Sequence, residues 1–232
     1  MTTRPRILVN FAVSLDGKTN PAPSKRHGAF AMSRGKQDWR LMRELRARAD
    51  AILIGATNQR TDDPGLSLSP EERERRSAAG EPLPARIVVT TRGEGIRPDA
   101  KIFDRSIGGP AYVVHAANMS DAVRAQLAPV ATLIEMDATS VSMAKLLPWM
   151  RKTLGAQVVM CEGGGDLVAQ MFAARAVDEL YVTVVPRILG GVHAPTLAGG
   201  AGFDVDEIPD ATLTSLERIG DELFLRYDFP WA

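Results

Sequence analysis

The stretch that decides the fold is Gln157-Val158-Val159-Met160-Cys161-Glu162-Gly163-Gly164-Gly165-Asp166-Leu167-Val168. Apolar residues that favour β-strands lead into three glycines, and an apolar pattern with helical spacing starts at Leu167. This order predicts a strand, a tight turn and a helix. Glycine lets backbone N–H groups approach a ligand, and a helix N-terminus favours negative charge, so the turn is suited to a phosphate. The structural alternative is a tight connection without a ligand.

Strand-like and helical runs alternate along the rest of the chain, which predicts an α/β fold. We expect a predominantly parallel central sheet with helices on both faces and an antiparallel C-terminal strand, all within one domain over residues 1–232. The strands are predicted at residues 6–14, 51–56, 86–90, 111–115, 131–136, 179–185 and 222–229. A first helix is predicted after its cap Ser33, with Trp39, Met42, Leu45 and Ala49 on one face. Others are predicted at residues 121–128, capped by Ser120, at residues 142–154 and after the glycines. The charged run that follows Ser69 is expected to be a solvated loop or a short surface helix.

Composition limits the classes of function. Twenty-eight basic residues balance 28 acidic ones, so no bulk charge points to nucleic acid or to a membrane surface. No apolar run reaches the roughly 20 residues of a membrane span. The only cysteine, Cys161, cannot form an internal disulfide, and its apolar strand indicates a core residue in a reducing, cytoplasmic protein. No pattern of metal ligands is present, so we expect no metal site.

Four segments have the character of ligand-binding loops. Residues 13–18 and 55–64 follow apolar strands and carry Asp16 and Asp62, the third is the glycine turn with Glu162, and the fourth is the Gly/Pro-rich run 185–195. Turn and cap chemistry is the structural alternative for the aspartates. No familiar catalytic set accompanies these loops, so an enzyme of this kind would rely on a bound cofactor.

In order and spacing, these motifs resemble the reductase family of riboflavin biosynthesis. That family comprises the C-terminal domain of the bifunctional bacterial deaminase-reductase and the stand-alone archaeal and fungal reductases. The matching sequence segments are Ser14–Lys18, Arg46–Ala51, Gly55–Pro64 with Leu66, Arg86–Val89, Glu162–Gly165, Val177–Leu180 and Pro186–Gly191 with His193–Pro195.

The resemblance implies a dihydrofolate-reductase-like fold, a homodimer, and NADPH as the cofactor that reduces the ribose of a pyrimidine ribosylamine 5′-phosphate to a ribityl chain. The apolar strand at residues 181–185 is the expected interface edge of the dimer. Glu162 and Asp16 are the candidate catalytic residues. The implied cofactor-binding residues are Ala12, Asn58, Asp62, Thr91, Gly163, Gly164, Gly165 and Asp166, to which we add Arg92 for a 2′-phosphate. The implied substrate-binding residues are Ser33, Arg46, Leu66 and Glu162.

Three positions depart from the family pattern. Asn58 stands where threonine is usual, and Ser69 stands where a basic residue is common, which leaves the place of the substrate phosphate open. Asn10 replaces the lysine of the bacterial bifunctional forms, as in archaeal members. Two alternatives therefore remain: the same fold and cofactor acting on a pterin, a dihydrofolate or another heterocycle, or a non-catalytic nucleotide-binding protein.

Overall fold

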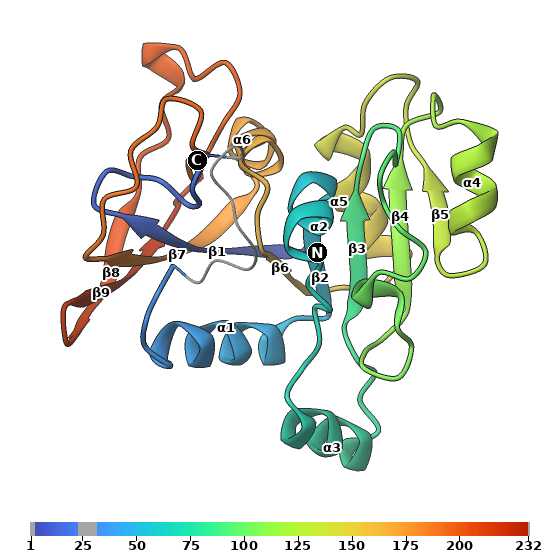
Figure 1. Ribbon diagram of the computed structural model, residues 1–232, viewed down its shortest axis with the longest axis horizontal. Helices are drawn as coiled ribbons and strands as arrows, with labels where there is room; N and C mark the ends of the chain where they lie inside the picture. The colour runs from blue at the N-terminus through green and yellow to red at the C-terminus, as the bar shows by residue number, and fades with distance from the viewer. Residues whose placement is uncertain (1–2, 23–31, 232) are drawn as a thin grey trace. The chain divides into compact units, whose positions relative to one another are not determined.

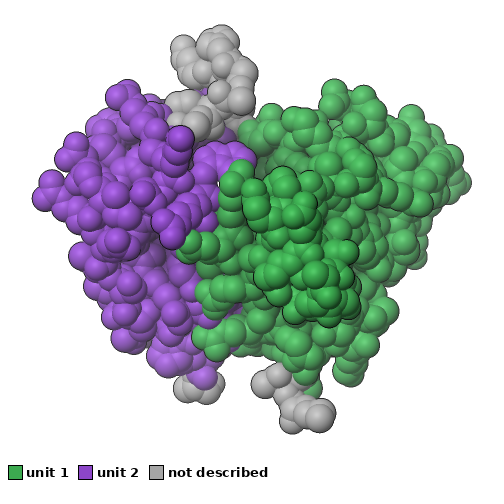
Figure 2. Space-filling view, turned by 90° about the horizontal axis from the view of Figure 1, so that it is seen from below, with its two compact units in different colours: residues 1–6, 43–160 green, residues 7–42, 161–232 purple. Residues whose placement is uncertain are grey.

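The computed structural model describes residues 3–22 and 32–231. The chain divides into two compact units, each built from discontinuous segments (Figure 2). The first unit contains residues 1–6 and 43–160, and the second contains residues 7–42 and 161–232. The prediction of a single domain over residues 1–232 stays a prediction.

The first unit is a parallel sheet whose strands follow the order β5-β4-β3-β2-β6. Registered pairs join β2 to β3, β3 to β4 and β4 to β5, all in parallel. Figure 1 shows α2 in front of these strands and α5 behind them. The elements of the unit are β2 (Ala51–Gly55), α2 (Ala56–Asp62), α3 (Pro70–Ala79), β3 (Ala85–Val89), β4 (Ala111–His115), α4 (Asp121–Leu127), β5 (Thr132–Glu135), α5 (Met143–Lys152) and β6 (Val158–Cys161).

Local sequence explains most of these elements. Ile52 and Leu53 are fully buried, as an apolar central strand of a parallel sheet requires. Ser120 caps α4 by accepting a hydrogen bond from the backbone N–H of Val123, as its position before the helix predicted. Pro148 lies within α5, whose buried residues include Leu146 and Met150.

The second unit contains strands in the order β1-β7-β9-β8. β1 (Arg6–Ser14) pairs in parallel with β7 (Val177–Val185), whereas β9 (Glu222–Asp228) is antiparallel to both β7 and β8 (Thr212–Ile219). The predicted antiparallel C-terminal strand is therefore confirmed, and β8 is a strand that the sequence analysis missed. Helix α6 (Gly165–Ala173) belongs to this unit, and α1 (Gln37–Arg48) begins in it.

The core of the second unit joins α6 to the end of the chain. Val168 and Met171 on α6 are fully buried. Phe172 meets Phe229 edge to face, with ring centroids 5.0 Å apart, and Phe229 stacks on Trp231. These aromatic contacts fix the helix that follows the glycine turn.

Three expectations from the sequence are wrong in detail. Ser33 does not cap the helix that follows it, because α1 begins only at Gln37. Trp39 does not lie on a buried helix face, since 56% of it is exposed. The strand at 181–185, expected to offer an interface edge, is interior because β7 pairs with both β1 and β9.

The charged stretch after Ser69 forms α3, which agrees with the expected short surface helix. Within the described ranges, no helix is both long and apolar enough to cross a membrane.

Candidate functional site

The glycine turn connects β6 to α6 through backbone conformations that require glycine. Gly163 has a φ of 107° and Gly164 a φ of 99°, a region that residues with a Cβ rarely enter. Helix α6 begins at Gly165, so the N–H groups of its first turn follow directly. The predicted strand, turn and helix are thus present, and a helix start of this kind is suited to an anion.

The third glycine of the turn, Gly165, is required for a different reason. A Cβ on Gly165 would lie 2.9 Å from the carbonyl oxygen of Thr196 and 3.3 Å from the nitrogen of Gly199. The backbone N–H of Gly199 donates to the carbonyl oxygen of Gly165 at 3.0 Å. Gly165 is therefore glycine because the loop around residues 196–199 packs against it.

Residues on either side of the turn differ in exposure. Glu162 is half-buried and Asp166 is exposed in the first turn of α6. Cys161 is fully buried, and burial is the main cause that raises the pKa of its thiol to about 12. The sulfur is therefore a neutral thiol at physiological pH, which confirms Cys161 as a core residue and excludes a thiolate nucleophile.

Asp16 links two of the four predicted loops. Its carboxylate accepts hydrogen bonds from Ser14 Oγ at 2.6 Å, from the N–H of Leu189 at 3.1 Å and from the N–H of Gly190 at 2.7 Å. These hydrogen bonds, Ser14 first, lower the pKa of Asp16 to about 2. The group is a carboxylate at neutral pH, so its geometry suits positioning of the loops and not donation of a proton.

The loop that follows β7 reaches the glycine turn as well. The N–H of Leu15 donates to the carbonyl oxygen of Arg187, and Lys18 forms an isolated bridge with Thr196. Because Gly199 binds Gly165, residues 185–199 connect the Asp16 turn to the start of α6. The structure thus brings three of the four predicted segments together within the second unit.

Ser33 also lies in the second unit, where its hydroxyl binds the carboxylate of Glu222 at 2.8 and 3.0 Å. Glu222 accepts a further hydrogen bond from the backbone N–H of Arg34. The sequence analysis did not find Glu222, which is 189 residues away from Ser33 and opens β9. A glutamate at the start of an alternating strand carries no signal of its own. Ala12 lies near the end of β1 and is the register partner of Thr183 on β7.

The other family-implied residues lie in the first unit. Asn58 and Asp62 are four residues apart on α2, so their side chains lie on one face of the helix. Thr91 and Arg92 follow β3 and are exposed, and the Arg92 guanidinium is 4.0 Å from the carboxylate of Glu94. The turn that carries them is fixed by a hydrogen bond from the N–H of Gly93 to Thr90 Oγ1 at 2.9 Å.

The proposed substrate residues of this unit are deeply buried. Arg46 is 6% exposed and donates to the carbonyl oxygen of Ser67 at 3.0 Å. Leu66 is 2% exposed and has a φ of 49°, a strained value for a residue with a branched side chain. Both residues are therefore part of the packed interior of the first unit.

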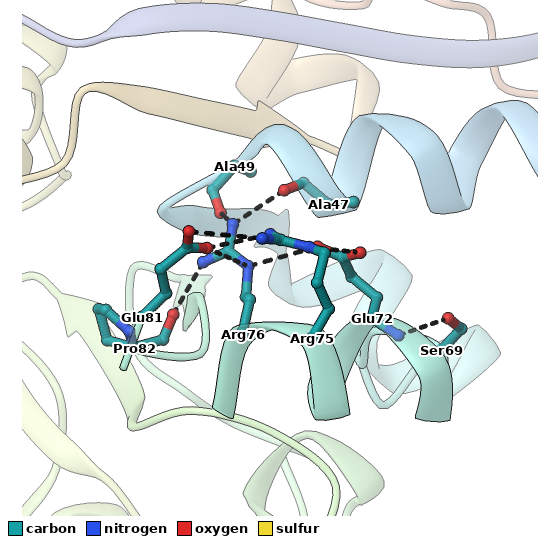
Figure 3. A network of polar contacts seen from close by, with 8 residues as sticks. All are labelled: Ala47, Ala49, Ser69, Glu72, Arg75, Arg76, Glu81 and Pro82. Carbon is teal, nitrogen blue, oxygen red and sulfur yellow. Dashed lines mark hydrogen bonds and ion pairs between the residues drawn. The ribbon is translucent and has the colours of Figure 1, made fainter. Parts of the chain in front are cut away.

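Ser69, the position that departs from the family pattern, serves α3. Its hydroxyl accepts the N–H of Glu72 at 3.2 Å and caps the helix. Further along α3, Arg76 donates to the carbonyl oxygens of Ala47, Ala49 and Pro82 at 2.8 to 3.1 Å (Figure 3). The hydrogen bonds of Arg76 are therefore structural, because all three acceptors are backbone carbonyl oxygens of the same unit.

Comparison with known proteins shows a family that matches this chain over most of its length. The model of a protein family described as the RibD C-terminal domain matches residues 5–225. Over 220 residues the chain is 31% identical to the 2,5-diamino-6-ribosylamino-4(3H)-pyrimidinone 5′-phosphate reductase of Archaeoglobus fulgidus, and the match covers 94% of this chain and 95% of that protein.

Solved structures show the same fold. A pyrimidine reductase-like protein from Corynebacterium diphtheriae superposes with a TM-score of 0.81 at 21% identity, covering 98% of this chain and 93% of that one. RibD of Acinetobacter baumannii gives a TM-score of 0.76 at 20% identity, and this chain spans 58% of its length. These matches confirm the predicted α/β fold. With the family model matched over most of its length, the chain belongs to the family of the RibD C-terminal domain.

Proposed function

We propose that this protein is an NADPH-dependent reductase that converts the ribose of a pyrimidine ribosylamine 5′-phosphate into a ribityl chain. The observation that carries the proposal is the glycine turn, where two residues with positive φ lead into the N-terminus of α6 beside a half-buried Glu162. Family membership and the similarity to the archaeal reductase support it.

The residues of the turn fit a nicotinamide dinucleotide. Gly163 and Gly164 have no side chain to keep a pyrophosphate from the backbone, and the N–H groups of the first turn of α6 can donate to it. When bound, the dinucleotide supplies a hydride. In the first unit, Arg92 is an exposed cation whose fork of N–H donors suits a 2′-phosphate, which favours NADPH over NADH. Asn58 and Asp62 are the proposed polar contacts from α2.

Glu162 is the proposed catalytic residue. Hydride arrival at C1′ is easiest when that carbon has cationic, imine-like character, and a carboxylate at hydrogen-bond range stabilises positive charge as it develops. A second negative charge would not help to hold a pyrophosphate, so we assign Glu162 to the sugar or the ring amino group. Asp16, whose pKa is about 2, is assigned to holding the loop at Leu189 and Gly190 in place.

The decisive experiment compares three substrates on the purified protein. NADPH oxidation is followed with the diamino ribosylaminopyrimidine phosphate, with its deaminated counterpart and with dihydrofolate. We expect turnover with a ribosylaminopyrimidine and none with dihydrofolate. Turnover with dihydrofolate alone would show the heterocycle reductase alternative instead. NADPH binding without turnover of any of the three would favour a non-catalytic nucleotide-binding protein.

We also propose a homodimer, formed through the β8–β9 hairpin. Leu213 and Leu216 on β8 are 46% and 59% exposed, and they share a face with their register partners Tyr227 and Leu225 on β9. An apolar sheet face of this kind is typical of an interface.

Light scattering tests the dimer directly. Leu216→Glu should convert a dimer into the 25.1 kDa monomer, whereas Ser215→Glu, on the opposite face, should remain dimeric. A monomeric wild type at working concentration would contradict the proposal.

A further inference from the structure

Four polar side chains of the second unit have an oxygen atom that is buried and has no hydrogen-bond partner within residues 3–22 and 32–231. They are Asn10 Oδ1, Asn20 Oδ1, Asp38 Oδ1 and Thr183 Oγ1. Thr183 is fully buried. Most buried polar atoms in folded proteins are paired, because an unpaired one costs about 1–3 kcal/mol. Four of them in one unit require an explanation.

The sheet register brings two of them to one face. Thr183 on β7 is the partner of Ala12 on β1, and Asn10 lies two residues before Ala12. Because side chains alternate along a strand, Asn10, Ala12 and Thr183 point to the same side. Ala12 is a position that the family resemblance assigns to the cofactor. A ligand on this face would therefore lie next to the cofactor.

Asp38 lies in the first turn of α1, and its carboxyl group has the side chains of Thr183 and Glu222 as neighbours. Burial is the largest influence on its carboxyl group and raises its pKa, Thr183 lies close enough to lower the pKa, and Glu222 raises it again. Glu222 is in turn held by the hydroxyl of Ser33, which the family resemblance places at the substrate. Asp38, Thr183 and Asn10, here called the Asp38 cluster, thus adjoin both the cofactor-side and the substrate-side residues of the unit.

The chemistry of the cluster defines its ligand. Asn10 Oδ1 and the carboxylate of Asp38 are acceptors, and the hydroxyl of Thr183 can donate or accept. Two acceptors and a hydroxyl match a ligand that presents neighbouring N–H groups. A 2-amino-4-pyrimidinone presents such an edge, because its 2-amino group and its N3–H are adjacent donors that a carboxylate can accept together.

We propose that Asp38 and Thr183, with Asn10 beside them, bind the pyrimidine ring of the substrate and select the 2-amino ring over its deaminated, 2-oxo counterpart. This inference rests on the proposed function and answers what that function leaves open, namely which of the two rings is reduced. The 2-oxo ring keeps N3–H but presents an acceptor oxygen where the amino group was. A carboxylate that faces this oxygen loses one hydrogen bond and is repelled by the oxygen. The site should therefore discriminate strongly between the 2-amino and the 2-oxo ring.

Asp38→Asn tests the inference because asparagine offers one acceptor and one donor. That pair matches N3–H and the 2-oxo oxygen, so the variant should prefer the deaminated substrate. We expect the ratio of kcat/KM for the diamino over the deaminated substrate to fall by about 100-fold or more. Asp221→Asn makes the same chemical change at an exposed position in the turn between β8 and β9, and it should leave the ratio unchanged.

Binding of the free bases provides a measurement that does not depend on turnover. Calorimetry should show that 2,5,6-triamino-4-pyrimidinone binds the wild type more tightly than 5,6-diaminouracil, and that Asp38→Asn reverses the order. If the wild type reduces neither substrate yet shows this preference, the proposed function fails and the ring site stands. The ring site is wrong if the wild type reduces a substrate but Asp38→Asn changes neither the kcat/KM ratio of the two substrates nor the affinity ratio of the two free bases.

Thr183 provides a second variant in case Asp38→Asn does not fold. Thr183→Val keeps the shape of the side chain and removes the hydroxyl, and Thr183→Ser restores it. We expect Thr183→Val to weaken binding of the triamino base by about tenfold with an unchanged melting temperature, and Thr183→Ser to recover it. Equal binding by all three proteins would remove Thr183 from the site and overturn the inference.

Discussion

Two buried polar side chains, one in each unit, differ in how their hydrogen bonds are met. In the first unit, Arg76 is 6% exposed, and its two terminal guanidinium nitrogens donate to three backbone carbonyl oxygens, whereas its Nε has no hydrogen-bond partner within the described residues (Figure 3). In the second unit, Thr183 is fully buried and its hydroxyl has no partner within the described residues. A buried polar group whose hydrogen bonds are met within the protein stabilises the fold. A group left without partners on a face beside candidate ligand residues is better explained by a ligand.

The glycine turn is the first place to test this comparison, and it carries the largest expected effect. Gly164→Val should abolish measurable NADPH binding, because a side chain at a φ of 99° would strain the turn and block approach to the backbone. Gly220→Val, in the hairpin between β8 and β9, introduces a similar strain at a φ of 62° with open space around it. It should lose stability yet bind NADPH normally. Normal NADPH binding by Gly164→Val would mean that the turn only connects β6 to α6 and does not bind the cofactor.

Glu162→Gln separates a functional polar group from a structural one. We expect turnover to fall about 100-fold, since loss of one charged contact to a transition state costs about 2–4 kcal/mol. NADPH affinity and melting temperature should change little. Glu217→Gln, on the exposed strand β8, is the matched control and should keep full activity. An unchanged turnover number in Glu162→Gln would remove it from catalysis, and a joint loss of stability and affinity would mark it as structural.

Arg76→Met should lower the stability of the protein and leave its activity unchanged, the reverse of the effect expected for Glu162→Gln. Three carbonyl oxygens lose their donor, so the free energy of unfolding should fall by about 2 kcal/mol, or about 4–8 °C in melting temperature. Activity measured well below the transition should not change. Its neighbour Arg75 is 51% exposed and pairs only with carboxylates at the surface, so Arg75→Met should cost less than about 1 kcal/mol. Equal losses in the two variants would mean that the buried network contributes no special stability.

Arg92→Ala carries the smallest expected effect. NADPH affinity should fall about tenfold while NADH affinity stays the same, because only NADPH has the 2′-phosphate. Arg97→Ala removes another exposed cation of the first unit, one that pairs with Asp63 and Asp99. It should affect both cofactors alike. If Arg92→Ala also weakens both cofactors equally, the 2′-phosphate lies elsewhere.

Much of the fold could be predicted from local sequence. The bounds of β1 agree with the predicted strand, and the turn between β6 and α6 is where the glycines predicted it. Helix α2 was missed because its residues, Ala56–Asp62, are small or polar and lack an apolar period, and because its N-cap Gly55 has no capping side chain. The exposed strand β8 was missed because it has no buried face to impose alternation.

Sequence alone determined the elements whose causes are local: the apolar central strands, the Ser120 cap and the glycine turn. Tertiary structure decided what the polar residues do. Ser33 meets Glu222 across 189 positions, and Asp16 meets Gly190 across 174. Ser69, which the family pattern placed near a phosphate, caps α3 instead. Hydrogen bonds between residues so far apart leave no periodicity or spacing in the sequence, because the distance between their atoms is fixed only when the strands and loops that carry them have packed.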